Sequence, residues 1–161
     1  MFPQKNQRGE REAEQRPRFQ TTPNPAISCK KEKRMDYPAL LAVLQQHANP
    51  ERAVPMQAYM KHRFAYFGIG KPELARLCSP FFKGAAKQPV DWDFVRRCWD
   101  DPHRELQYTA LEYLKKMQQR LTPQDIPRLQ TLITEKSWWD SSDVLDRIVG
   151  DIALRHPEVN N

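Results

Sequence analysis

The sequence predicts an all-α protein, a partial α-solenoid in which antiparallel helix pairs build a superhelix. Large apolar residues recur three or four positions apart along most of the chain, which is helical spacing. A cap residue followed by proline divides these stretches at Asn49-Pro50, Asp101-Pro102 and Thr122-Pro123. No segment shows the sustained apolar–polar alternation of a strand, and no Asn-Gly hairpin turn is present.

The first expected helices each combine a start signal with an apolar stripe. In chain order they are a helix from Asp36 to about Ala48, one opened by Asn49-Pro50, one opened by Pro72 after a turn with two glycines, and a short one capped by Asp91. Their stripes are Leu40, Leu41, Val43 and Leu44; Met56, Tyr59, Met60 and Phe64; Leu74, Leu77 and Phe81; and Phe94, Val95 and Cys98.

The second half of the chain continues the pattern. Asp101-Pro102 is expected to cap one helix, Thr122-Pro123 the next, and a last helix runs from about Trp138 to Leu154. Two of the stripes are Leu106, Ala110, Leu111 and Leu114; and Ile126, Leu129, Leu132 and Ile133. Helices in this rhythm, without heptads, favour a solenoid of helix pairs over a four-helix bundle. A generic helical bundle remains the alternative.

Composition restricts the class of protein. At 161 residues, with 39% hydrophobic and 29% charged residues, the chain fits one soluble domain. No apolar run approaches the roughly 18 residues of a membrane span, and the N-terminus lacks an apolar signal segment. The cysteines, Cys29, Cys78 and Cys98, form no CxxC pair, which argues against a disulfide framework or a zinc site. We therefore expect no membrane association and a reducing cytoplasm, the bacterial cytosol or nucleoid.

The positive charge lies mostly in the N-terminal segment. Residues 1–34 hold nine Lys and Arg against four Glu, whereas residues 35–161 hold 17 basic and 16 acidic side chains. The segment is rich in proline and charge and poor in apolar residues, so we predict that residues 1–34 form a disordered basic extension. Met35 stands where the helical pattern begins and is a candidate alternative start site.

The run Lys136-Ser137-Trp138-Trp139-Asp140-Ser141-Ser142-Asp143 carries the most distinctive chemistry. Trp139 and Asp143 are four residues apart, so on a helix they share one face. Trp138 points elsewhere and is expected in the core. An aromatic plane beside a carboxylate attracts a cationic species through cation–π and charge interactions.

Ordinary interpretations of these residues stay open. A tryptophan at a helix start is commonly core, and an aspartate there is commonly a solvated cap that the helix dipole favours. Asp140, Asp143 and Asp146 are spaced by three on one helix, but without a histidine they are weak evidence for a metal, and we predict no metal site.

Four motifs in order resemble the AlkD-type DNA alkylation repair family, monofunctional glycosylases built of HEAT-like repeats. The run from Lys136 to Asp143 resembles its KSWWDxVD signature. The other three are Pro55 to Lys61 with Phe64 to Pro72, Trp99 to Ala110 with its Arg104-Glu105-Leu106-Gln107-Tyr108, and Gly150-Asp151 with His156-Pro157-Glu158. The resemblance spans roughly residues 36–159.

The resemblance implies an activity and a site. Such enzymes remove cationic N3- and N7-alkylpurines from duplex DNA on a concave surface, without flipping the lesion into a pocket, the more common strategy. By motif position Trp139 stacks on the deoxyribose, Asp143 stabilises an oxocarbenium-like sugar and orients the water, and Tyr59 lines the cleft. No metal or redox cofactor is called for, and a monomer bound to duplex DNA with alkylated bases is expected.

Lys61, Arg63 and Lys71 flank Tyr59 and are candidates for phosphate contacts, with Lys61 the first choice. A solvated charged face is the alternative for these cations, and plain core is the alternative for Tyr59. The other notable side chains are expected to be structural or inert, namely Arg104, Glu105, Gln107, His103, His156, Cys78 and Cys98.

Two departures from the family pattern qualify this assignment. Ser142 stands where the family usually has Val or Thr, and family members continue for several helices beyond the position of Asn161. A second cleft tryptophan and a catalytic arginine belong to that further part. We therefore interpret residues 35–161 as the N-terminal part of the glycosylase domain, and expect an uncovered apolar face on the last helix pair and weak stability. The alternatives are a non-catalytic binder of branched or damaged DNA and a HEAT-like protein-interaction module.

Overall fold

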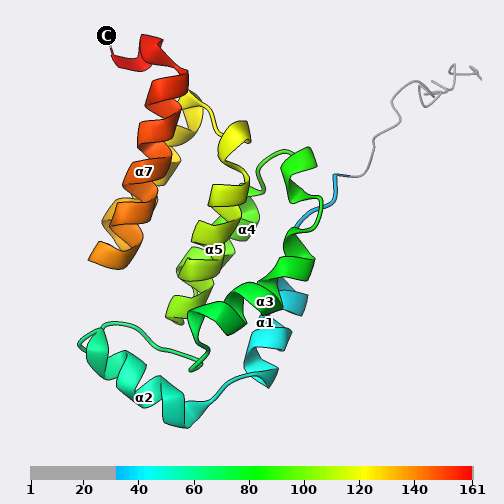
Figure 1. Cartoon of the computed structure of the whole chain (residues 1–161), viewed down its shortest axis with the longest axis vertical. Coiled ribbons are helices and arrows are strands. Elements are labelled where there is room, and N and C mark those ends of the chain that lie inside the picture. The colour runs from blue at the N-terminus through cyan, green and yellow to red at the C-terminus, as the bar shows by residue number, and fades with distance from the viewer. Residues whose placement is uncertain (1–31, 161) are drawn as a thin grey trace, which may run out of the picture. The chain divides into compact units, whose positions relative to one another are not determined.

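The computed structural model describes residues 32–160, and the predicted disordered extension, residues 1–34, lies outside them except for its last three positions. The described residues form helices and no strand. In chain order the α-helices are α1 (Tyr37–Gln46), α2 (Pro50–Tyr59), α3 (Lys71–Phe82), α4 (Trp92–Asp100), α5 (Arg104–Lys116), α6 (Ile126–Glu135) and α7 (Trp139–Arg155) (Figure 1). Short 3-10 helices are η1 (Ala85–Lys87), η2 (Gln118–Arg120), η3 (Pro123–Asp125) and η4 (Pro157–Asn160). None of the described helices is both long enough and apolar enough to cross a bilayer.

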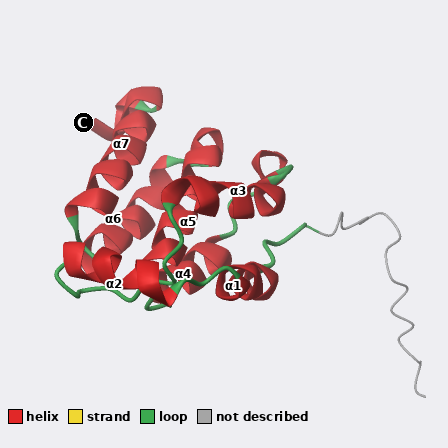
Figure 2. Cartoon of the chain, turned by 60° about the horizontal axis from the view of Figure 1, so that its bottom comes forward, coloured by secondary structure: helices red, strands yellow, loops and turns green. Residues whose placement is uncertain are grey.

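The helices pack as successive hairpins. Helix α4 packs on α5 and α6 packs on α7, and residues 101–103 and 136–138 form the connections within these two pairs. Helix α5 also contacts α3 on one side and α7 on the other, so α3, α5 and α7 form one layer (Figure 2). The predicted all-α, solenoid-like architecture is confirmed.

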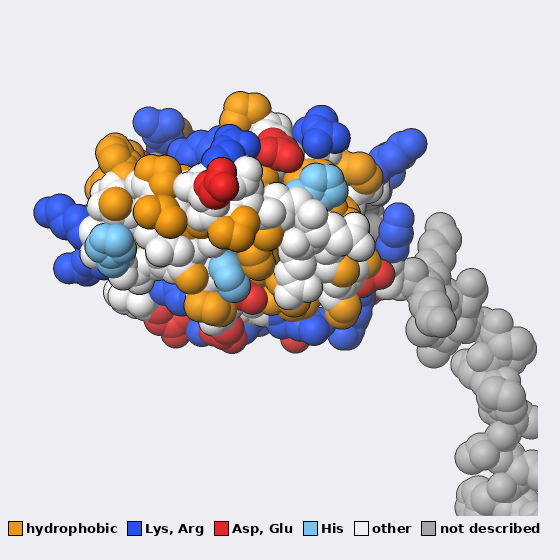
Figure 3. Space-filling model, turned by 90° about the horizontal axis from the view of Figure 1, so that it is seen from below, with side chains coloured by type: hydrophobic (Ala, Val, Ile, Leu, Met, Phe, Trp, Pro, Cys, Tyr) orange, Lys and Arg blue, Asp and Glu red, His pale blue; other side chains and the backbone are white. Residues whose placement is uncertain are grey.

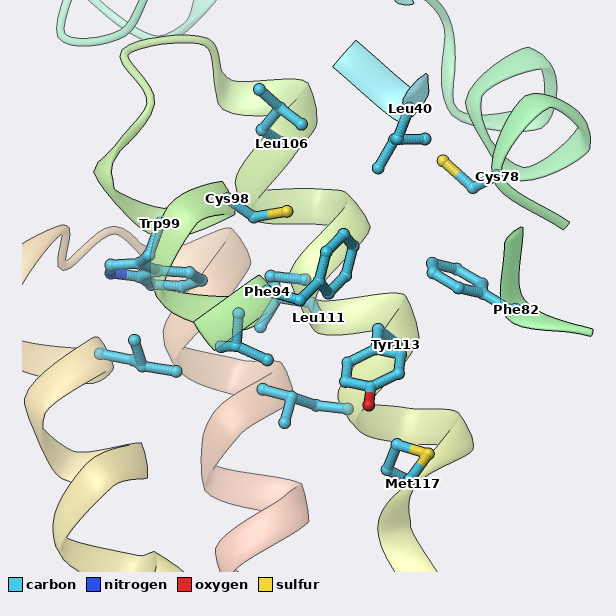
Figure 4. Close-up of a cluster of buried hydrophobic side chains, with 14 of the residues drawn as sticks. Leu40, Cys78, Phe82, Phe94, Cys98, Trp99, Leu106, Leu111, Tyr113 and Met117 are labelled. Atoms are coloured by element: carbon cyan, nitrogen blue, oxygen red, sulfur yellow. The ribbon is translucent and has the colours of Figure 1, made fainter. Parts of the chain in front are cut away.

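One large apolar core joins the α3–α5–α7 layer to α1, α4 and α6 (Figure 4). Trp99 of α4 is fully buried, and the Phe94 and Tyr113 rings meet edge to face at 5.2 Å between α4 and α5. The Asp91 N–H donates to the Tyr113 hydroxyl over 2.8 Å, which gives this core phenol a polar partner. Burying large side chains of this kind stabilises the fold by about 1.5–3 kcal/mol each.

Most helix starts follow the sequence signals. The Asp36, Asn49 and Asp91 side chains accept hydrogen bonds from backbone N–H groups three residues on. Thr122 and Asp125 form a reciprocal capping box at η3.

Three local expectations are wrong. Asp101-Pro102 does not cap α5, which begins at Arg104, because the backbone of this stretch pairs with Ala65 instead. Helix α2 ends at Tyr59, so Phe64 lies outside it. In α3 the fully inward residue is Phe82, while Phe81 is only half-buried.

The expected uncovered apolar face on the last helix pair is also not found. Among the large hydrophobic side chains of α6 and α7, only Trp139 and Leu154 are exposed. The outward surface of α7 carries Asp143, Asp146 and Arg147 instead.

Candidate functional site

The start of α7 exposes the predicted aromatic–carboxylate pair. Trp138 is extended and stands at the cap position, and the Ser141 and Ser142 N–H groups donate to its carbonyl. Trp139 is therefore the first helical residue and Asp143 lies one turn further on the same face. The Trp139 side chain is 56% exposed, and Asp143 is exposed.

The other side of the same turn is buried against α5. The Arg104 Nη2 donates to Asp140 Oδ1 over 2.5 Å, and the Tyr108 hydroxyl donates to Asp140 Oδ2 over 2.6 Å. Arg104 Nη2 also donates to Ser141 Oγ over 2.9 Å. The side chains of Arg104 and Asp140 are 0% and 4% exposed. We call these four residues, Arg104, Tyr108, Asp140 and Ser141, the Arg104 network.

The loop before α7 is also held by contacts around the start of α5. The Lys136 ammonium donates to the Asp101 carbonyl over 2.6 Å, and burial lowers the pKa of Lys136. The Arg104 guanidinium lies 4.0 Å from the centroid of the Phe64 ring, so its flat face is covered by an aromatic side chain. Lys136, the basic residue of the sequence signature, thus supports the fold of this loop.

Glu105 and Gln107 of α5 are structural, as predicted. Glu105 Oε1 accepts hydrogen bonds from the Gly68 and Ile69 N–H groups, at 2.9 and 3.2 Å, and so holds the loop between α2 and α3. Gly68 has a φ of +91°, and a Cβ there would lie 2.0 Å from the Asn49 carbonyl oxygen, so the loop requires glycine. The Gln107 amide donates to carbonyls at the end of α4, which the helix itself leaves unpaired.

The end of α2 meets the start of α7 through a small apolar cluster. Its buried members are Ala53, Met60 and Tyr66, and Trp138 packs against them. Trp138 is therefore half-buried in this cluster, not in the main core. Because Met60 and Trp138 are the chain neighbours of Tyr59 and Trp139, the two exposed aromatics project from adjoining parts of the structure.

The turn after α2 follows Tyr59 directly and carries Lys61 and Arg63, both exposed. Tyr59 is 71% exposed, so the alternative that it belongs to the core is wrong. Lys61 and His62 both have left-handed backbone angles, with φ of 53° and 55°, a conformation that costs non-glycine residues free energy. The Arg63 guanidinium lies 4.6 Å from the Trp138 ring centroid. Viewed from this end, hydrophobic and uncharged side chains form the middle of the surface, and Lys and Arg side chains lie mainly at its edges, among acidic and histidine side chains (Figure 3).

A groove of about 400 Å³ runs between α3, α5 and α7. Asp140 and Val144 line the α7 wall of this groove. Trp139 and Asp143 each precede one of these residues on the helix and lie outside the groove. Burial raises the pKa of Tyr108, which also lines the groove, and the hydrogen bond to Asp140 raises it further. The Lys71 ammonium lies 5.1 Å from the Tyr108 ring centroid.

Sequence reasoning did not single out the groove or Tyr108. The tyrosine's position one turn after Arg104 in the same motif was the available signal. Within residues 32–160 no cluster of three or more His, Cys, Asp or Glu side chains is arranged to hold a metal ion.

Fold and site together define an all-α, solenoid-like protein with an exposed aromatic–carboxylate pair at one helix start. The sequence model of the family described as DNA alkylation repair enzyme matches residues 40–161, and the chain belongs to this family. A similar solved structure is described as a predicted DNA alkylation repair enzyme from Enterococcus faecalis, with 29% sequence identity and a TM-score of 0.63. The match covers 69% of this chain and 53% of that chain, so this chain spans about half the length of that relative. No curated protein matches the sequence.

Proposed function

We propose that the chain acts in DNA repair by hydrolysing the N-glycosidic bond of cationic N3- or N7-alkylated purines in duplex DNA, without flipping the lesion. The observation that carries this proposal is the exposure of Trp139 and Asp143 on one face of α7, one turn apart. Membership of the DNA alkylation repair family supports it.

The chemistry needs few protein groups. When the bond between C1′ and the purine nitrogen breaks, its electron pair leaves with the purine, which departs neutral. A cationic purine is a good leaving group without a general acid, so one carboxylate suffices, in contrast to the paired carboxylates of most glycoside hydrolases. Asp143 stabilises the positive charge that develops on the sugar and takes the proton of the water that attacks C1′.

The neighbouring side chains bind and orient the DNA. Trp139 stacks on the deoxyribose beside the lesion, and its exposure leaves a ring face available. Tyr59 lines the same side of the cleft, and Lys61 contacts a backbone phosphate. None of these steps calls for a metal ion or a redox cofactor.

The test is a base-excision assay of the full 161-residue chain on duplex DNA that contains 7-methylguanine, with the released base quantified by chromatography. Asp143→Asn is expected to lower the single-turnover rate by about 10²- to 10³-fold, the usual loss for one transition-state stabilising group. The matched control is Asp146→Asn, which removes another exposed carboxylate of α7 and leaves the rate unchanged.

Two outcomes contradict the proposal. A wild-type rate in Asp143→Asn removes the assigned role of this carboxylate. Gel shifts of damaged or branched DNA without base release by the wild-type chain indicate a non-catalytic binder.

A further inference from the structure

The carboxylate of Asp140, the residue after Trp139, is almost fully buried at the α7 wall of the groove. Asp140 accepts hydrogen bonds from the Arg104 guanidinium and from the Tyr108 hydroxyl, and its side chain is 4% exposed. Both of its carboxylate oxygens are occupied by donors of the protein, so we assign it no direct contact with DNA. Its position, the residue after Trp139 and three before Asp143, nevertheless places it inside the proposed site.

We propose that Asp140 is a positioning residue: held by Arg104 and Tyr108, it sets the direction in which Trp139 and Asp143 leave the start of α7. This inference rests on the proposed function, because it assigns a supporting role within that same site. Trp139 and Asp143 would touch the substrate, and Asp140 acts only through them.

The local structure of α7 creates the need for such a residue. Helix starts are normally fixed by a side-chain cap, and Trp138 at the cap position provides none. Trp139 is the first residue of the helix and is mostly exposed, so few neighbours restrain its side chain. Its direction therefore depends on the backbone of the first turn, which the Asp140 side chain ties to α5.

Stability alone does not explain a buried ion pair at this point. Replacing such a pair by well-packed apolar side chains is often neutral or stabilising, because removing two charges from water offsets their attraction. What the pair adds is geometry, since the planar guanidinium reaches Asp140 Oδ1 through Nη2 and Oδ2 through Nε, the latter over 3.4 Å. A directional link across two helices suits a residue that must hold its neighbours in place.

The direct test observes Trp139 without requiring activity. The full chain is labelled with fluorotryptophan, which reports on its four tryptophans by ¹⁹F NMR, and the Trp139 line is assigned with Trp139→Phe. In Asp140→Asn and Tyr108→Phe the Trp139 line is expected to broaden or split, while the line of Trp92 on α4 stays unchanged. Asp146→Asn, the same charge change on the exposed side of α7, leaves all four lines as in the wild type.

Tyr108→Phe removes a single hydroxyl and is the variant least prone to unfold, so it decides the question if Asp140→Asn does not fold. An unchanged Trp139 line in the folded variants overturns the proposal. So does an equal change in the Trp92 line, which would indicate general loosening.

The second measurement separates positioning from binding. At saturating enzyme, Asp140→Asn is expected to lower the single-turnover excision rate by about 10- to 100-fold, the effect of a displacement of about 1 Å in a site, with unchanged affinity for DNA. A wild-type rate in the folded variant contradicts the positioning role. If the wild-type chain releases no base, the proposed function fails, and the ¹⁹F measurement still decides whether Asp140 positions Trp139.

Discussion

The first two turns of α7 contain two aspartates of the same chemistry in opposite surroundings. Asp140 is buried and paired with Arg104, whereas Asp143, three residues later, is exposed and forms no salt bridge among the described residues. The two adjacent tryptophans divide in the same way, since Trp138 packs in a small cluster and Trp139 is exposed. One helix face thus holds the turn in place, and the other is open to a ligand.

Residue type alone therefore does not show which carboxylate of this motif supports the fold and which is available to a ligand. A carboxylate that is fully paired has its hydrogen-bonding capacity and its charge used by the protein. An exposed carboxylate beside an exposed ring keeps both available for a cationic transition state. The pairing partner on another helix therefore decides which aspartate is free to act in the proposed site.

The largest expected effect is on the buried side. Arg104→Met leaves the Asp140 charge buried without its partner, so the free energy of unfolding should fall by about 3–5 kcal/mol, measured by urea denaturation. The double variant Arg104→Met with Asp140→Leu removes both charges and should recover most of this loss. A loss below about 1 kcal/mol in the single variant would show that this side is no more constrained than an exposed salt bridge.

Particular residues show what the sequence could and could not predict. Spacing placed Trp139 and Asp143 on one face, because four residues make about one helical turn whatever the surroundings. The partner of Asp140 lies 36 positions away on α5, and no local pattern links two residues at that distance. Phe81 and Phe82 both fit an amphipathic helix, and only the packing of α3 on its neighbours determines that Phe82 is the buried one.

The Asp101-Pro102 error has a similar cause. The dipeptide has the composition of a helix start, but the backbone around it is used elsewhere: the Pro102 carbonyl accepts the Ala65 N–H, and the Arg104 N–H donates to the Ala65 carbonyl. Asp101 instead accepts hydrogen bonds from the Tyr37 hydroxyl and the His103 N–H. A tertiary contact therefore overrides the cap signal.

The intermediate effect is a loss of stability at alkaline pH, which tests the buried side of α7 through Tyr108. Burial and then the hydrogen bond to Asp140 raise the pKa of Tyr108 above that of an unfolded tyrosine, about 10. Above pH 10 the unfolded chain loses this proton and the folded chain keeps it, so stability is fully present below pH 10 and falls as the pH rises. The slope from one such group is at most about 1.4 kcal/mol per pH unit.

Other buried phenols and thiols contribute in the same direction, since burial also raises the pKa of Tyr37, Tyr66, Tyr113, Cys78 and Cys98. Comparison with Tyr108→Phe isolates the Tyr108 share. Urea denaturation at pH 9, 10 and 11 should give a shallower decline for the variant than for the wild type. If the free energies of unfolding of the two proteins decline in parallel, the pKa of Tyr108 is not raised by folding, and water has more access to this hydroxyl than its contacts indicate.

The smallest expected effect is on the exposed side, at Lys61. Lys61 has a left-handed backbone and an exposed side chain, and it lies two residues after Tyr59 in the chain. If Lys61 contacts one phosphate, Lys61→Gln should reduce the slope of log affinity against log salt by about 1, with stability unchanged within about 0.5 kcal/mol. Lys87→Gln on η1 is the matched control, because Lys87 is also exposed and η1 follows the C-terminal end of α3. The slopes are measured by fluorescence anisotropy on one duplex. Equal slopes for the two variants would show that Lys61 does not contact a phosphate, and would limit the candidate DNA-binding surface to the first turns of α7 and the end of α2.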